Sequence, residues 1–136
     1  MTEQSLKEIS NFIDEAKIYY LATVDGDQPK NRPLGGHHIY DGRLMFTIGD
    51  HKNVYKQMQE NPKVEIVAFS KGKWLRYTGK AVFETDPKYS SFALEGSDFL
   101  QNIYNDKTGY HLALFHLEDA KAALLDGGGR EVKVFE

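Results

Sequence analysis

Residues 41–55 read DGRLMFTIGDHKNVY, and this stretch is the strongest indication of the fold. Asp41-Gly42 is a tight-turn pair of the kind that joins two antiparallel strands. The apolar run from 43 to 48 predicts a strand, which Gly49-Asp50 ends. The ten residues that follow, up to the Asn61-Pro62 pair, predict a short helix. A hairpin that leads into a strand–turn–helix unit therefore forms the centre of the predicted fold.

Short strands with turn signals between them surround this unit. A helix is predicted over residues 2–16, where Leu6, Ile9 and Ile13 recur at helical spacing. Antiparallel order with few long crossovers is typical of a closed or split barrel rather than a parallel α/β sheet. The sequence therefore predicts one domain over residues 1–136, mainly β with helices (α+β), built on an antiparallel barrel that is closed or split. We expect its strands at residues 18–24, 28–40, 43–48, 63–70, 74–85, 110–117, 121–125 and 131–135, with helical or irregular structure from 86 to 106.

The composition excludes several classes of protein. The net charge of −3 provides no general basic surface for nucleic acid or for an anionic membrane. The absence of cysteine excludes disulfides, thiolate metal sites, iron–sulfur clusters and cysteine nucleophiles. The five histidines lack metal-ligand spacing, so we expect no metal site. The first residues contain no apolar signal core and no apolar run could span a bilayer, so we expect a cytoplasmic protein.

A basic helix start follows the central strand. Lys52 stands in the predicted first turn, with His51 beside it and Thr47 on the preceding strand. A helix N-terminus has unpaired backbone N–H groups and a partial positive charge, so these residues could together hold a phosphate monoester. The alternative is a solvated lysine on a helix that Asp50 caps, and this segment alone favours that alternative.

The strand before the central hairpin is irregular. Pro29 and Pro33 interrupt residues 28–40, which predicts an edge or bulged strand, and Gly35-Gly36 permits a close approach of the backbone to another group. Unpaired backbone groups there could face a planar heterocycle, and Arg32 could reach a phosphate. An edge strand protected against aggregation explains the same residues equally well.

A tryptophan and an arginine share one face of a later strand. Alternation places Trp74 and Arg76 on one face and Leu75 and Tyr77 on the other. The pair suits stacking on a ring and contact with an anion, although a core or interface tryptophan is the simpler interpretation of this segment alone. No nucleophile elbow, P-loop or dinucleotide fingerprint occurs, so the sequence identifies no catalytic residue.

Taken together in this order, these segments resemble the pyridoxamine 5′-phosphate oxidase-like family of FMN-binding split barrels. The resemblance runs from residue 12 to residue 135. It implies a six-stranded split barrel that forms a homodimer with two FMN sites at the subunit interface. The order and spacing of the segments make it specific, and the segments are residues 20–26, 29–34, 41–47, 51–55, 61–64 and 73–81.

The resemblance also implies which residues contact FMN, and one such ligand would explain all three unusual segments. The implied residues are Arg32, Pro33 and Leu34 along the isoalloxazine and ribityl chain, Phe46 and Thr47 on the ribityl-phosphate side, His51, Lys52 and Asn53 at the phosphate, and Trp74 against the cofactor.

The function that follows from the resemblance is that of an FMN-dependent, flavin reductase-like oxidoreductase. Such a protein would reduce a small electrophile such as a nitroaromatic, with NAD(P)H as a candidate donor. The short relatives that the chain resembles include nitroimidazole-resistance proteins and general-stress flavoproteins. The C-terminal substrate segment of the true oxidase has no counterpart here, which argues against oxidation of pyridoxamine phosphate. A non-catalytic binder, carrier or sensor of FMN, heme or deazaflavin F420 is the alternative, and a ligand-free scaffold is a third.

Overall fold

The computed structural model describes all residues from 1 to 136 and contains four helices and eight strands. In chain order they are α1 (Glu3–Ala16), β1 (Tyr19–Asp25), β2 (Gln28–Leu34), β3 (His37–Tyr40), β4 (Arg43–Gly49), α2 (Asn53–Glu60), β5 (Lys63–Ser70), β6 (Lys73–Phe83), α3 (Pro87–Glu95), α4 (Asp98–Ile103), β7 (Leu112–Leu125) and β8 (Glu131–Phe135).

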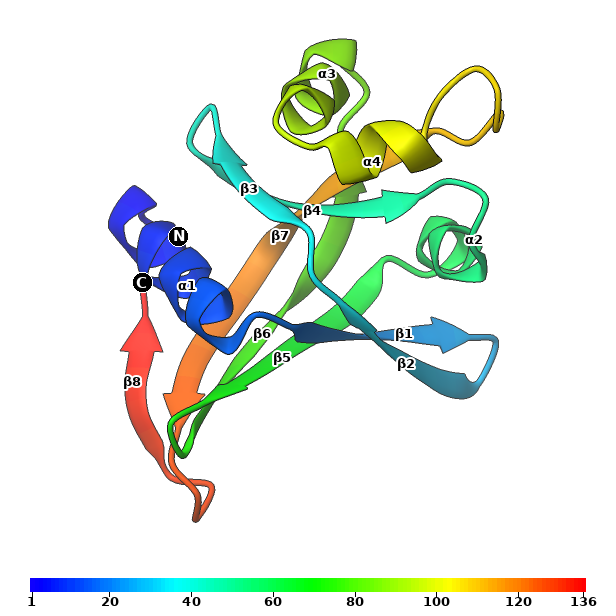
Figure 1. Cartoon of the computed structure of the whole chain (residues 1–136). Coiled ribbons are helices and arrows are strands. Elements are labelled where there is room, and N and C mark those ends of the chain that lie inside the picture. Colours follow the sequence, from blue (N-terminus) through cyan, green and yellow to red (C-terminus); the bar gives the residue numbers. More distant parts are fainter.

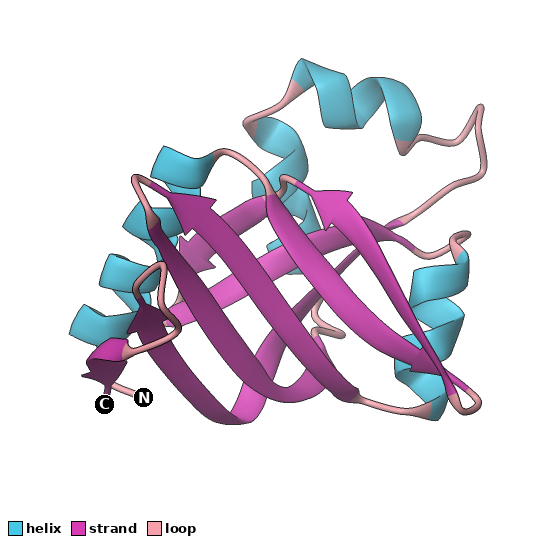
Figure 2. Ribbon diagram, turned by 90° about the horizontal axis from the view of Figure 1, so that it is seen from below, coloured by secondary structure: helices cyan, strands magenta, loops and turns pink.

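All eight strands join one antiparallel sheet that curls into a split barrel. The strand order is β2-β1-β5-β6-β7-β4-β3, and β8 pairs with β7 outside this path. The long strand β7 links the halves because it runs along β6 while its first residues pair with β4 and its last residues pair with β8. Figures 1 and 2 show strands that cross obliquely, with the helices on the outside of the sheet. The predicted fold class, mainly β with helices on an antiparallel split barrel, is confirmed.

The interior of the sheet holds the main hydrophobic core. Ile9 and Ile13 form the apolar stripe of α1 and are fully buried against it. The rings of Phe46, Tyr77 and Phe115 meet inside, with centroids 5.6 Å apart for the two phenylalanines and 6.2 Å apart for Phe46 and Tyr77. Burial raises the pKa of the Tyr77 hydroxyl to about 12.

A second apolar cluster fixes α3 on the other face of β4. Met45 points into this cluster, whereas Leu44 and Phe46 point into the main core, because alternate residues of a strand face opposite sides. Tyr89 and Ala93 of α3 pack against Met45, so both faces of β4 are covered. The cluster therefore holds α3, and α4 with it, beside β3 and β4.

The strand boundaries differ from the prediction in two places. The expected strand 28–40 is divided at residues 35–36 into β2 and β3, which lie at opposite edges of the sheet, as the prolines and glycines of an edge strand allow. The expected strands 110–117 and 121–125 are one strand, β7, because a register shift beside Gly79 and a positive φ of 51° at Asp119 let the ladder continue. None of the helices has both the length and the apolar character that crossing a membrane would require.

Candidate functional site

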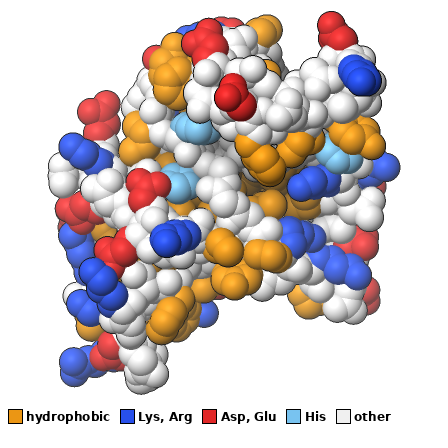
Figure 3. Space-filling model, viewed as in Figure 1, with side chains coloured by type: hydrophobic (Ala, Val, Ile, Leu, Met, Phe, Trp, Pro, Cys, Tyr) orange, Lys and Arg blue, Asp and Glu red, His pale blue; other side chains and the backbone are white.

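A groove opens between the β2–β3 junction, the end of β4 and α4. Its volume is about 560 Å³, within the range of small-molecule and cofactor sites. Residues 34–38 form one wall, Leu100 and Ile103 of α4 contribute apolar surface to the other, and Thr47 and Lys52 also line it. Figure 3 shows hydrophobic and histidine side chains around a hollow on this face of the molecule.

The close passage of Gly36 against β4 shapes this groove. The carbonyl oxygen of Gly36 accepts hydrogen bonds from the Tyr19 hydroxyl at 2.8 Å and from the Thr47 backbone N–H at 3.1 Å. A Cβ atom at position 36 would lie 1.8 Å from Thr47 Oγ1, so glycine alone fits here. Burial raises the pKa of Tyr19, which keeps its hydroxyl protonated as a donor.

The start of α2 presents uncompensated positive charge to the groove. Lys52 is the N-cap residue, is exposed, and makes no capping hydrogen bond and no ion pair. The backbone N–H of Val54 in the first turn has no acceptor in the chain. Asp50 does not cap the helix, because its carboxylate accepts from the His111 backbone N–H at 3.1 Å instead. The lysine and the helix end therefore suit a phosphate or carboxylate.

Arg32 is held in a network of neutral oxygens. Its guanidinium donates to the Leu21 carbonyl at 3.0 Å, to Thr23 Oγ1 at 2.7 Å and to Gln57 Oε1 at 2.9 Å. No carboxylate pairs with it, and burial lowers its pKa. The network ties β2 to β1 and α2, so Arg32 fixes the helix whose N-cap is Lys52.

The remaining predicted residues lie in several environments. Pro33 is exposed on β2, Asn53 is exposed at the start of α2, and the Phe46 ring is fully buried in the main core. The His51 ring stacks on Tyr110, with centroids 3.8 Å apart and an interplanar angle of 11°.

Trp74 lies on the outer face of the sheet. Its Nε1 donates to the Asp126 carbonyl at 3.2 Å, and the Arg76 guanidinium lies 4.8 Å from the ring centroid. The structure thus brings Leu34, Thr47 and Lys52 to the groove and leaves Trp74 outside its lining. The roles of all these residues in cofactor binding stay predictions.

Comparison with known proteins identifies the family. The family model described as pyridoxamine 5′-phosphate oxidase matches residues 5–122. The chain belongs to this family. The resemblance inferred from the sequence is confirmed, and the split barrel is the family's fold. No curated protein sequence matches the chain significantly.

Similar solved structures extend this finding. A NimC/NimA family protein from Clostridium acetobutylicum is 32% identical, with a TM-score of 0.86 over 98% of this chain and 92% of that chain. A protein from the same organism related to general stress protein 26 is 14% identical, with a TM-score of 0.70 over 100% and 96% of the two chains. A heme binding protein from Mycobacterium smegmatis is 14% identical, with a TM-score of 0.65 over 93% of this chain and 56% of that chain. At 14% identity, the last two show a shared fold alone.

Sequence reasoning missed α4 and His38 as contributors to the groove of this family member. Leu100 and Ile103 of α4 line it, although residues 86–106 were expected only to be helical or irregular. His38 also lines it, whereas adjacent histidines on a strand suggest structural or solvent-facing side chains. The apolar spacing within 98–103 could have indicated the helix, but no local signal shows that it folds back over β4.

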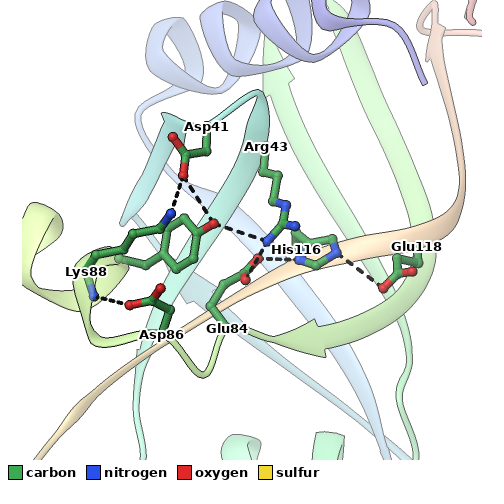
Figure 4. Close-up of polar contacts among 8 residues, drawn as sticks. Asp41, Arg43, Glu84, Asp86, Lys88, His116 and Glu118 are labelled. Carbon is green, nitrogen blue, oxygen red and sulfur yellow. Dashed lines mark hydrogen bonds and ion pairs between the residues drawn. The ribbon is translucent and has the colours of Figure 1, made fainter.

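A second group of polar side chains lies outside the groove and fixes the start of α3 (Figure 4). The Glu84 carboxylate, only 7% exposed, accepts from Arg43 Nη1 at 2.8 Å and lies 2.5 Å from His116 Nδ1. Hydrogen bonding to Lys88 lowers the pKa of Asp41, and the same contact raises the pKa of Lys88. These groups satisfy one another, so we interpret the cluster as structural and term it the α3 clamp, comprising Asp41, Arg43, Glu84, Lys88, Tyr89 and His116.

Proposed function

We propose that this protein binds FMN in the groove and acts as a small flavin-dependent oxidoreductase. The observation that carries the proposal is the uncompensated Lys52 at the N-terminus of α2, placed on an otherwise largely apolar groove. A phosphate at that helix start would meet a full positive charge, the unpaired Val54 N–H and the helix dipole together.

The chemistry of the groove fits a nucleotide with a flat, partly apolar ring system. Leu34, Ile48, Leu100 and Ile103 supply apolar surface, and the backbone at residues 35–36 lies between β2 and β3, outside both strands. Most of a bound ring would be covered by such side chains, while a few polar groups orient it.

The protein's own contribution would be binding and orientation. Lys52 would bind the phosphate, Arg32 would hold α2 in place, and the α4 wall would exclude water from the ring. FMN, when bound, supplies the electron-transfer chemistry. The substrate we propose is a small electrophile such as a nitroaromatic, with NAD(P)H as the donor.

We also propose that the protein works as a homodimer with its cofactor sites at the interface. Outward-facing residues of neighbouring strands lie opposite one another and form a row across the sheet. In order across the strands, the row is Tyr20, Val67, Arg76, Ala123 and Val134. Val134 is 62% exposed and Tyr20 is 44% exposed. Apart from Arg76 this row is apolar, and an exposed apolar row on a sheet face is typical of an interaction surface. Trp74 lies on the same face, where it would approach the partner's cofactor.

A non-catalytic binder of heme, FMN or deazaflavin F420 is the second candidate. The heme binding protein among the structural relatives favours it, because that protein shares the fold over 56% of its own chain. The absorbance spectrum of the purified protein, followed by mass identification of any released chromophore, separates these candidates. Bleaching of bound flavin by NADPH with turnover of a nitroaromatic supports the oxidoreductase, and a flavin that no donor reduces supports a carrier or sensor.

The test of the site compares Lys52→Ala with Lys56→Ala, an exposed lysine later on the same helix. We expect Lys52→Ala to weaken FMN binding by about 1–3 kcal/mol, because it removes a charge-assisted contact to the phosphate. Riboflavin, which lacks the phosphate, should lose much less affinity, and Lys56→Ala should change neither. Equal losses for FMN and riboflavin, measured by flavin fluorescence titration, would refute the assignment of Lys52.

A further inference from the structure

His38 has no hydrogen-bond partner in the chain although it lines the groove. Three other histidines are paired: His37 contacts Asp14, and His111 and His116 contact carboxylates through Nδ1. The His38 ring meets another side chain edge to face instead, since its centroid lies 6.0 Å from that of Phe92 at an interplanar angle of 83°. Its two ring nitrogens are therefore available to a ligand in the groove.

The ring of His38 is held in place by aromatic packing from α3. Phe92 stacks on Tyr40, with centroids 4.2 Å apart and planes 8° from parallel, and Tyr40 meets Tyr89 edge to face at 5.7 Å. These contacts fix one side of the imidazole between β3 and α3. His38 also lines the groove, so a ligand there would lie beside a ring that is already held in place.

The surroundings of His38 favour its neutral form. Burial lowers its pKa, and the charge of neighbouring His37 lowers it further. The two nitrogens of His37 face the Gly35 carbonyl at 3.2 Å and Asp14 Oδ1 at 2.8 Å, so that ring is already committed. A neutral His38 offers one donor and one acceptor, which suits an uncharged polar ligand.

We propose that His38 hydrogen-bonds the substrate, and that the substrate is an uncharged planar aromatic molecule that carries an oxygen acceptor. This inference rests on the proposed function, in which the flavin occupies the part of the groove near Lys52 and Thr47. The α4 wall, including Leu100 and Ile103, provides only apolar contact beside it. The Ser97 hydroxyl already caps α4 by accepting from the Leu100 N–H at 3.1 Å. Of the two histidines that line the groove, His38 is thus the one whose ring nitrogens are free to orient an oxygen-bearing ring.

The test compares two probe ligands on the FMN-loaded protein. Nitrobenzene and toluene share a ring, but only nitrobenzene carries oxygen acceptors, and the perturbation of flavin absorbance reports the Kd of each. We expect the wild type to prefer nitrobenzene and His38→Leu to reduce that preference by about 3–10-fold, mainly through weaker nitrobenzene binding. His38→Gln keeps a donor and should retain the preference within about twofold.

The outcomes separate this inference from the proposed function. FMN affinity, measured in parallel by fluorescence, should stay within about twofold in both variants, because His38 is not placed at the phosphate. A wild type that binds FMN but shows no preference, or a His38→Leu variant that weakens both probes equally, would overturn the role of His38 alone. A wild type that binds no FMN would refute the proposed function and this inference with it.

Discussion

Substitution of Gly36 by alanine tests the close contact that shapes the groove. The new Cβ would lie 1.8 Å from Thr47 Oγ1 and 3.2 Å from Thr47 Cβ, far inside contact distance. Thr47 is buried, and its β-branched Cβ carries a hydroxyl, a methyl group and a hydrogen. Rotation about χ1 of Thr47 therefore relieves the overlap only if the Cβ hydrogen takes the place of the hydroxyl. Otherwise the backbone at Gly36 must move, and its carbonyl then leaves the Tyr19 hydroxyl, which it meets at 2.8 Å.

The magnitude follows from these two effects. Overpacking of a tight contact costs about 1–3 kcal/mol. Loss of the acceptor for the fully buried Tyr19 hydroxyl costs about 1–3 kcal/mol more, because the group cannot reach water. We therefore expect Gly36→Ala to lower the free energy of unfolding by about 2–6 kcal/mol.

Urea unfolding followed by circular dichroism measures this change, with Gly35→Ala as the matched control. A Cβ at position 35 would meet only the Lys17 carbonyl, at 3.8 Å, so the control should change stability by less than about 0.5 kcal/mol. Thr47→Ala introduced into Gly36→Ala removes the clashing oxygen and should restore at least about 1 kcal/mol. Equal stability of the two glycine variants, or strict additivity in the double variant, would show that the contact does not constrain the fold.

Three further substitutions test other parts of the structure. In the α3 clamp, Glu84→Gln should lower the free energy of unfolding by about 1–3 kcal/mol at pH 7, because His116 loses a buried, charged acceptor. Urea unfolding that matches the wild type would contradict this. Because the pKa of Tyr77 is raised to about 12, the unfolded chain loses this proton first above pH 10, and the free energy of unfolding falls as pH rises. The free energy of unfolding of Tyr77→Phe should therefore fall less than that of the wild type between pH 9 and 11.5. Because the pKa of His38 is lowered in the folded chain, the imidazole of the unfolded chain is protonated first as pH falls through about 6.5. The wild type should therefore lose more stability than His38→Gln between pH 7 and 5. Parallel pH profiles of wild type and variant would refute either linkage.

Local patterns predicted most of the elements because each carries its own signal. The apolar spacing of Ile9 and Ile13 defines α1, and the alternation around Leu75 and Tyr77 is confirmed by their burial on one face of β6. The division of the expected strand 28–40 was not predicted, because a glycine pair marks a break without saying where the chain goes next. The same limit applies to the groove, in which Lys52 was expected and Leu100 was not.

The order of turn, strand and helix signals along this chain was enough to indicate an antiparallel barrel, and the resemblance to a family specified the split form, since hydrophobic periodicity and turn chemistry are properties of neighbouring residues. It was also enough to single out Lys52 as a cation at a helix start. Only the tertiary structure decided which groups surround that lysine. Packing of α3 on Met45 places α4 beside β4, and the narrow crossing at Gly36 sets the opposite wall. Contacts between residues distant in sequence depend on how whole elements fill space, and no local pattern encodes that.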